Sequence, residues 1–290
     1  MAKWLLIDGY NLSFRAFFAI PEMTRSDGFP TNALLGWLRS IWYLQDNHKP
    51  DHMVAFFDLG RSEYRHALSP SYKATRVEAP PAFKEQVPWI KKTTEALGIP
   101  VIEKQGIEAD DLIASAALKL QSEGNEVFIV SSDKDFAQLL RPGISQLLPP
   151  PTANPKLGWR LLGHEGVQEK FGVGPDQIVD YLALIGDTSD NIPGIPGVGP
   201  KTAAKWIQEY GPINNILSKA NYITPPRFQT ILPQQGELLK LNVQMITLHT
   251  NLDAGPLKDT SPKPQELLEI LDSMEMHRTS LEVRKRFNIQ

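Results

Sequence analysis

The sequence predicts an α/β protein with a mostly parallel central sheet flanked by helices. Three short apolar runs, at residues 4–8, 52–58 and 127–133, have the length and composition of buried strands. Helical patterns separate these runs, and strands that alternate with helices are typical of a parallel sheet covered on both faces. Each run also ends in an aspartate, and ligands of such sheets bind outside the carboxyl ends of the strands. The same pattern therefore predicts the fold and the place of its site.

The helices follow from the spacing of apolar residues between the strands. The first run turns at Gly9-Tyr10-Asn11 into an aromatic-rich helical stretch. Residues 33–44 are rich in Leu, Trp and Ile at helical spacing, and residues 108–121 place apolar side chains on one helix face. From about residue 161 we expect the chain to be mostly helical.

The composition is that of a globular protein, since 41% of the 290 residues are hydrophobic and 22% are charged. The chain has no cysteine, which excludes disulfides and cysteine-ligated zinc and gives no sign of an oxidising compartment. Its N-terminal apolar run is too short for a signal peptide, and no run of about 18 apolar residues could span a membrane. We therefore expect a cytoplasmic protein.

The aspartates at the strand ends are the first sign of a metal site. Asp8, Asp58 and Asp133 end three strands, and adjacent strands lie about 4.8 Å apart. Two unit charges about 4 Å apart repel by roughly 1 kcal/mol in water and about 4 kcal/mol at an effective dielectric constant of 20. A single aspartate at a strand end is more often a turn residue, but three together favour a bound cation.

Further carboxylates stand at three other places. Glu108-Ala109-Asp110-Asp111 opens a helix, where acidic residues are also common as simple first-turn caps. Asp133-Lys134-Asp135 is expected to have strand-end geometry, in which residues i and i+2 can both face an ion. Asp187-Thr188-Ser189-Asp190 places two acids at i,i+3, one turn apart.

All of these candidate ligands are carboxylate oxygens, which suit Mg²⁺ or Mn²⁺ better than zinc. Such sites hold two ions about 3.5–4 Å apart in many nucleases and polymerases. The net charge of the chain is −3, but nine of the carboxylates account for −9, so the remainder carries +6 and suits a polyanionic substrate. The nine are Asp8, Asp58, Glu108, Asp110, Asp111, Asp133, Asp135, Asp187 and Asp190.

Residues 61–92 are basic and are interrupted by prolines. They hold seven Lys or Arg against three Glu, with Tyr64, Tyr72, Phe83 and Trp89 interleaved. Most such runs are solvated loops. Because this one follows the second predicted strand, we expect a mobile element beside the acidic pocket that grips phosphates and offers aromatic rings to bases.

A glycine-rich turn follows Asp190. Segment 191–202 contains Gly197-Val198-Gly199 and opens a helix at Pro200-Lys201, an arrangement that resembles a helix-hairpin-helix element. Glycines let the backbone approach a phosphate, N–H groups at the helix start point toward it, and the lysine supplies charge. The spacing excludes a P-loop, and a plain interhelical turn is the alternative.

Taken together, these residues resemble the 5′-nuclease superfamily, in particular the 5′→3′ exonuclease domain of bacterial DNA polymerase I and the flap endonucleases of phages and bacteria. The motifs keep the family's order through nearly the whole chain: Leu6-Ile7-Asp8-Gly9, Phe56-Phe57-Asp58, Tyr72-Lys73-Ala74-Thr75-Arg76, Glu108-Ala109-Asp110-Asp111, Ser132-Asp133-Lys134-Asp135, Gly186-Asp187-Thr188-Ser189-Asp190-Asn191 and the Gly197/Gly199/Lys201 hairpin. The resemblance implies a PIN-like nuclease core over residues 1–180 with a helical arch at about 61–92. It also implies a helical helix-hairpin-helix (H3TH) region over 181–290.

The resemblance implies roles for single residues as well. One Mg²⁺ region would be held by Asp8, Asp58, Glu108, Asp110 and Asp111, and the second by Asp133, Asp135, Asp187 and Asp190. The scissile phosphate would be contacted by Lys73 and Arg76, and the acids expected to be catalytic are Asp8, Asp58 and Asp133. Tyr72 would stack on a base. The duplex backbone, with a bound K⁺, would be held by Gly197, Gly199, Lys201 and Thr202.

The implied function is a structure-specific 5′ nuclease that cuts 5′ flaps and branched or nicked DNA in replication and repair. It would use two or more Mg²⁺ ions, with Mn²⁺ as a substitute, and we expect a monomer without a membrane partner. Two alternatives stay open. A non-catalytic module that binds branched DNA predicts binding insensitive to Mg²⁺, and a PIN-like ribonuclease would share the strand-end acids but not the hairpin and the basic arch. A phosphatase-like hydrolase leaves the hairpin unexplained.

Overall fold

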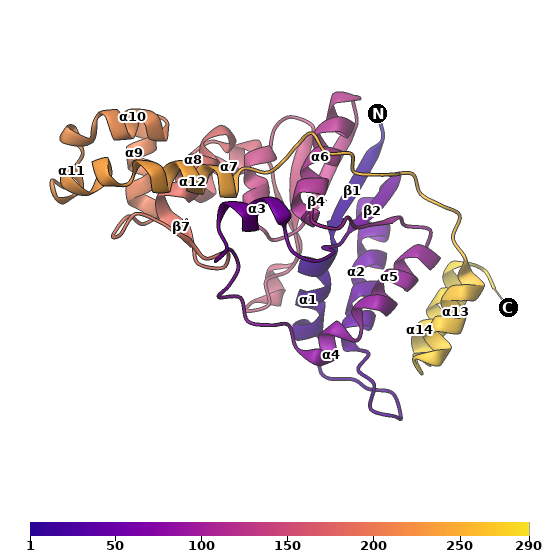
Figure 1. Ribbon diagram of the computed structural model, residues 1–290. Helices are drawn as coiled ribbons and strands as arrows, with labels where there is room; N and C mark the ends of the chain where they lie inside the picture. Colours follow the sequence, from indigo (N-terminus) through magenta and orange to yellow (C-terminus); the bar gives the residue numbers. More distant parts are fainter. Residues whose placement is uncertain (290) are drawn as a thin grey trace.

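The computed structural model describes residues 1–289 and consists of an α/β core with a helical arm that extends from it (Figure 1). The core is built on a six-stranded sheet of order β3-β2-β1-β4-β5-β6. Its strands are β1 (Lys3–Asp8), β2 (His52–Phe56), β3 (Val101–Ile102), β4 (Glu126–Val130), β5 (Ile144–Leu148) and β6 (Arg160–Leu162).

The sheet is mostly parallel, as predicted. β1 pairs in parallel with β2, where Asp8 lies opposite Phe56, and with β4, where Ile7 lies opposite Val130. The edge strand β6 runs antiparallel to β5. The three predicted runs are β1, β2 and β4, but sequence patterns missed β3, β5 and β6. β3 and β6 are only two and three residues long, too short to give a periodic signal.

Helices cover both faces of the sheet, and the side chains of β1 alternate between two hydrophobic clusters. Leu6 packs with α6 on one face, and Leu5 and Ile7 pack with α2 on the other. All three are fully buried, as expected for a central parallel strand. The core helices are α1 (Gly9–Ala19), α2 (Asn32–His48), α3 (Glu63–Leu68), α4 (Pro81–Lys84), α5 (Val87–Ala96) and α6 (Ala109–Ser122).

The helical arm is formed by residues 164–246 and projects away from the sheet, with α3 lying where the arm meets the core (Figure 1). Its elements are α7 (His164–Phe171), α8 (Ile178–Ile185), β7 (Gly186–Asp187), β8 (Ile192–Pro193), α9 (Pro200–Tyr210), α10 (Ile213–Ser218), α11 (Arg227–Ile231) and α12 (Gly236–Ile246). The described residues also include five short 3₁₀ helices: η1 (Asp135–Leu139), η2 (Pro155–Leu157), η3 (Pro175–Gln177), η4 (Ala220–Tyr222) and η5 (Leu232–Gln234).

The chain then returns to the core. After α12 an extended segment runs back across the sheet to α13 (Pro264–Ser273) and α14 (His277–Arg286), which pack beside α5 rather than with the arm (Figure 1). Leu267, Leu271 and Val283 of this C-terminal hairpin are fully buried in the same cluster as the α2 side chains. Among residues 1–289, none of the helices combines the length and the apolar character needed to cross a membrane.

Candidate active site

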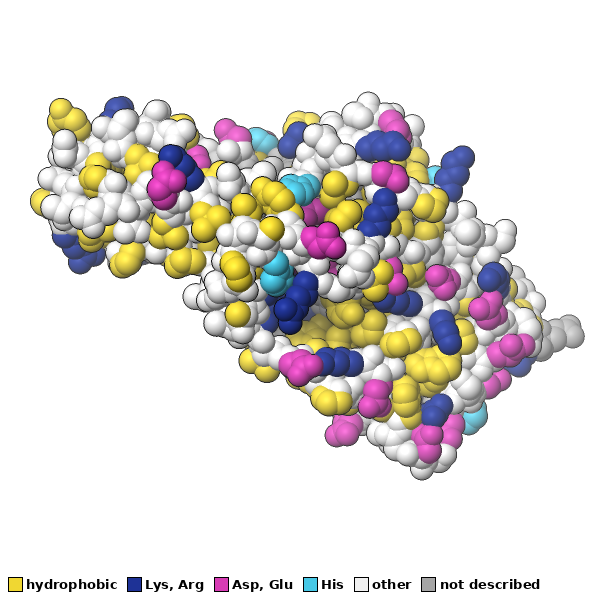
Figure 2. Space-filling model, in the orientation of Figure 1, with side chains coloured by type: hydrophobic (Ala, Val, Ile, Leu, Met, Phe, Trp, Pro, Cys, Tyr) yellow, Lys and Arg dark blue, Asp and Glu magenta, His cyan; other side chains and the backbone are white. Residues whose placement is uncertain are grey.

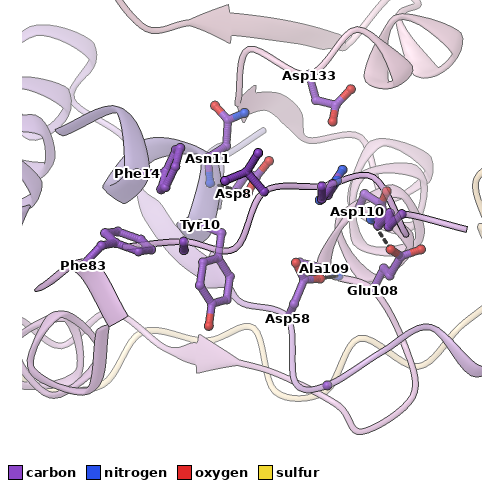
Figure 3. A pocket seen from close by; sticks show the side chains of 15 residues that line it. Asp8, Tyr10, Asn11, Phe14, Asp58, Phe83, Glu108, Ala109, Asp110 and Asp133 are labelled. Atoms are coloured by element: carbon purple, nitrogen blue, oxygen red, sulfur yellow. Dashed lines mark hydrogen bonds and ion pairs between the residues drawn. The ribbon is translucent and has the colours of Figure 1, made fainter. Parts of the chain in front are cut away.

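The carboxyl ends of the central strands open into a cavity of about 540 Å³. Five carboxylates from distant parts of the sequence line it, and Figure 3 shows them arranged around one space: Asp8, Asp58, Glu108, Asp110 and Asp133. Figure 2 shows a hollow on this face of the molecule with Lys and Arg side chains at its border. The convergence predicted from the strand-end aspartates is therefore present in the fold.

Asp8 ends β1, which lies between β2 and β4, the strands followed by Asp58 and Asp133. Its Oδ1 accepts a hydrogen bond from the backbone N–H of Asn11 at 3.0 Å and so caps α1, and its Oδ2 accepts one from the Ser131 hydroxyl at 2.8 Å. Burial raises the pKa of Asp8 to about 7, although both hydrogen bonds oppose this, and the charges of Asp58 and Asp133 raise it further. A buried carboxyl whose proton is held this strongly gains from a nearby cation.

Asp58 and Asp133 lie in the loops that follow their strands. Asp58 accepts the backbone N–H of Ala109 at 2.7 Å, which joins the end of β2 to the start of α6. The expected strand-end geometry of Asp133 and Asp135 is wrong. β4 ends at Val130, and Asp133 Oδ1 accepts the N–H of Asp135 at 3.0 Å, which turns the chain into η1. Asp133 therefore faces the cavity, whereas Asp135 belongs to a second acid group.

The first acid group stands at the start of α6. Glu108 occupies the N-cap position, and one ligand atom from each of Glu108, Asp110 and Asp111 lies within 4.8 Å of the others. Burial raises the pKa of Asp110 well above its usual range, and the charge of Glu108 adds to this. The carboxylates of Glu108 and Asp111 both contact the same arginine.

That arginine is Arg65 of α3, which in the sequence is merely one of the basic residues of segment 61–92. Its side chain is 2% exposed, and its Nη1 lies 2.5 Å from Glu108 and 2.7 Å from Asp111. Its Nε also donates to the carbonyl of Met245, at the end of α12, at 2.8 Å. Burial alone would lower the pKa of Arg65, but the surrounding carboxylates outweigh it and raise the pKa. A buried, fully paired arginine holds acids in place and offers nothing to a phosphate.

Asp111 is consequently bound on both oxygens. Besides the Arg65 contacts, its Oδ1 accepts the backbone N–H of His249 at 2.9 Å. It is 3% exposed and is not among the residues that line the cavity. The structure thus places Asp111 behind Glu108 and Asp110, against Arg65.

The second acid group joins Asp135 to Asp187 and Asp190, whose ligand atoms also lie within 4.8 Å of one another. Asp187 and Asp190 are not one helical turn apart, as the i,i+3 spacing suggested. A tight turn between β7 and β8 brings them together. Asp135 Oδ1 is buried without a hydrogen-bond partner among the described residues. An orphaned carboxylate oxygen in an all-oxygen group fits a hard divalent cation.

The predicted basic arch is packed at two of its aromatic rings, whereas its residues 74–78 are exposed. Tyr72 is 3% exposed, and its hydroxyl donates to Asp190 at 3.0 Å, with Glu108 also within 3.3 Å. Phe83 is buried as well, because both rings fill the hydrophobic core beneath the segment. The ring of Tyr72 therefore has no exposed face for a base in this conformation. Tyr64, 42% exposed, is an aromatic ring of the segment that does reach solvent.

Lys73 and Arg76 line the cavity and pair with carboxylates of the two acid groups. Lys73 lines the cavity and contacts Glu108, and its backbone is in the left-handed region at φ 56°. Arg76 lies 2.6 Å from Asp190 and lines the same cavity. Lys73 holds the pKa of Glu108 below its usual range, although burial opposes this.

The glycine-rich turn connects α8 to α9, as a helix-hairpin-helix element requires. Gly197 has φ +80°, a conformation that L side chains rarely adopt, and Gly199 is the N-cap of α9. Lys201 is exposed in the first turn of α9, next to the partly exposed Thr202. The four residues predicted to bind DNA therefore lie together at one helix start.

Two family models match the chain. A 5′-3′ exonuclease N-terminal resolvase-like domain matches residues 3–172, and a 5′-3′ exonuclease C-terminal SAM fold matches residues 173–267. The chain belongs to the 5′-3′ exonuclease family. This confirms the resemblance predicted from the ordered motifs, and with it the α/β fold class.

Other members of this family cover the chain to different extents. The 5′-3′ exonuclease of Aquifex aeolicus (strain VF5) is 38% identical over 99% of this chain and 97% of its own length. DNA polymerase I of Bacillus caldotenax is 35% identical over 85% of this chain, but this chain spans only 28% of that polymerase. The flap endonuclease of bacteriophage T5, solved as a pseudo-enzyme-product complex with DNA and metal ions, is 25% identical with a TM-score of 0.69 over 94% of this chain and 99% of its own.

Proposed function

We propose that this 5′-3′ exonuclease family member is a divalent-metal-dependent nuclease that cuts 5′ flaps and 5′ ends of branched or nicked DNA. The observation that carries the proposal is the convergence of five carboxylates from separate elements on one cavity, with a second acid group beside it. The family relationship supports nuclease chemistry, and the solved phage flap endonuclease binds both DNA and metal ions.

The residues of the site divide into ion-binding and phosphate-binding sets. The first ion region would be held by Asp8, Asp58, Glu108 and Asp110, and the second by Asp133, Asp135, Asp187 and Asp190, with Mg²⁺ as the expected ion and Mn²⁺ as a substitute. Bound ions of this kind activate water and stabilise charge on the attacked phosphate and the leaving oxygen. Asp111 would act through Arg65, which orients Glu108.

Lys73 and Arg76 would supply positive charge to the scissile phosphate. Both now pair with acids of the site, so they are held where that phosphate would approach. The exposed Lys201 and the N–H groups at the start of α9 would hold the duplex backbone, with K⁺ at the hairpin. We expect the protein to act as a monomer in replication and repair.

Cleavage of a labelled 5′-flap duplex in Mg²⁺ tests the proposal. Asp133→Asn should lower the single-turnover rate by at least about a hundredfold, because a ligand charge at the cavity is lost. Asp176→Asn, at an exposed position on the arm, is the matched control and should cut like the parent. Flap binding without any cut product would favour the non-catalytic module, and preferential cleavage of a matched RNA flap would favour the ribonuclease.

A further inference from the structure

Lys134 is a cation within the acidic site to which the proposed chemistry gives no part. It stands in the chain between Asp133 and Asp135, at the N-cap position of η1. Its Nζ lies 2.7 Å from Oδ2 of Asp187, a residue of another element more than 50 positions away. The side chain is one-third exposed, whereas that of Asp187 is 9% exposed. Lys134 therefore reaches inward to a buried carboxylate instead of extending into solvent.

Both oxygens of Asp187 are engaged as a result. Its Oδ1 accepts the backbone N–H of Ser189 at 2.9 Å and the hydroxyl of the same residue at 2.5 Å, and its Oδ2 accepts Lys134. Asp135, in the same acid group, differs from Asp187, because its Oδ1 is buried and has no hydrogen-bond partner among the described residues. A divalent ion that satisfies Asp135 and also uses Asp187 must compete with the ammonium group for Oδ2.

The charges of the second acid group are balanced by two side chains. The group has three carboxylates and two cations: Lys134 pairs with Asp187, and Arg76 pairs with Asp190. Each full charge within a few ångströms changes the free energy of a bound divalent ion, and it does so strongly in a partly buried group. Lys134 thus both blocks a ligand atom and cancels part of the negative charge that attracts an ion.

We propose that Lys134 is an internal counter-ion that holds Asp187 in the ion-free protein and sets the affinity of the Asp135/Asp187/Asp190 group for divalent ions. An ion that binds this group exchanges with a resident cation, so the three carboxylates stay folded together when no ion is bound. The inference rests on the proposed function only in taking this group to be a divalent-ion site.

Titration of the whole protein with Mn²⁺ in a calorimeter, without DNA, tests the proposal. Lys134→Met should tighten Mn²⁺ binding at the Asp135/Asp187/Asp190 group by about tenfold or more, because a competing charge is removed. Lys134→Arg keeps the charge and should stay within about threefold of the parent. Lys119→Met, at an exposed lysine on α6, is the matched control. Lys134→Gln replaces Lys134→Met if circular dichroism shows that the latter is unfolded.

A double-mutant cycle assigns the effect to Asp187. In an Asp187→Asn background, Lys134→Met should tighten Mn²⁺ binding clearly less than in the parent, because the contact with Asp187 is lost and only the charge of Lys134 near Asp133 and Asp135 remains. Unchanged or weaker binding in folded Lys134→Met, or equal tightening in both backgrounds, would overturn the proposal. A protein that shows the expected Mn²⁺ affinities but cuts no flap would refute the proposed function and leave this inference standing.

Discussion

Arg65 links three elements at one buried point. From α3 it contacts Glu108 and Asp111 of the α6 start, and it donates to the carbonyls of Met245 and Thr247 at the end of α12. The sequence showed a basic residue in a basic segment, and only the fold distinguishes it from its exposed neighbours. Its burial depends on residues about 180 positions away, which no local pattern contains.

Replacing Arg65 should show how much this point contributes to stability. Arg65→Met removes the buried cation that Glu108 and Asp111 share, so the free energy of unfolding should fall by about 3–5 kcal/mol. Urea denaturation monitored by tryptophan fluorescence measures the change. Arg39→Met, at an exposed position of α2, should stay within about 0.5 kcal/mol of the parent. A loss of less than about 1 kcal/mol at Arg65 would mean that the buried ion pairs do not hold the α6 start.

Asp180, in the first turn of α8 and outside the acid groups, should make the free energy of unfolding depend on pH. Burial raises the pKa of this carboxyl, and the N–H of Ile213 only partly opposes it. The folded protein therefore binds this proton more strongly than the unfolded chain, so stability is lost as pH rises from about 4 through the folded pKa. Asp180→Asn removes this slope and should be more stable than the parent at pH 7, but not at pH 3.5.

Urea unfolding at both pH values, for parent and variant, measures the contribution of Asp180. The exposed control Asp176→Asn should show the same pH profile as the parent. An Asp180→Asn variant that is less stable than the parent at pH 7 would show that the carboxylate is favoured at the start of α8, against the burial argument.

At the scale of elements, DNA binding by the glycine-rich turn and the start of α9 can be tested separately from catalysis. Lys201 is exposed in the first turn of α9 and belongs to neither acid group. Lys201→Gln should weaken binding to a nicked duplex and lower the slope of log K against log salt by about 0.9, because one phosphate contact is lost. Fluorescence anisotropy between 50 and 200 mM KCl, in Ca²⁺ to prevent cutting, measures both effects. An unchanged slope, equal to that of Lys119→Gln, would remove Lys201 from the interface.

The C-terminal hairpin α13–α14 offers an internal comparison of two leucines. Leu271 is fully buried against the core, whereas Leu281 is 66% exposed on the neighbouring helix. Leu271→Ala should lower the free energy of unfolding by about 2–5 kcal/mol, since it removes a packed side chain and leaves a cavity. Leu281→Ala should cost less than about 0.5 kcal/mol. Equal and small effects would show that the hairpin is not part of the core's cooperative unit.

For the whole molecule, the sequence predicted the place where carboxylates gather more reliably than the cations and N–H groups that pair with them. Strand-end aspartates follow from sheet topology, so the pattern of strands and helices suffices to place Asp8, Asp58 and Asp133 at one edge. The geometry expected for Asp133 and Asp135 was wrong because β4 ends at Val130 and the Asp133 carboxylate then accepts the N–H of Asp135 as the chain turns into η1. The prediction that the aromatic rings of the basic segment are open to bases was wrong for Tyr72 and Phe83, which are buried in the core by tertiary packing.

The pairing of acids with the chain's own cations is a property of the complete fold. Lys73, Arg76, Lys134 and Arg65 come from three segments, and their contacts reach Glu108, Asp111, Asp187 and Asp190. These pairs offset part of the negative charge that the fold gathers at the site. A divalent ion that binds these carboxylates would therefore displace a cation of the chain. Because Lys73 and Arg76 belong to the basic segment and Asp187 and Asp190 to the helical arm, ion binding would affect contacts of both.

Anomalous diffraction from crystals soaked in Mn²⁺ shows whether side chains distant in sequence form one site for divalent ions. We expect Mn²⁺ peaks at the cavity bounded by Asp8, Glu108, Asp110 and Asp133, and at the group formed by Asp135, Asp187 and Asp190. The Asp8 and Asp187 carboxylates should lie within coordination distance of these peaks. Crystals that diffract well but show no Mn²⁺ at either group, or show it only at exposed acids elsewhere, would contradict this expectation.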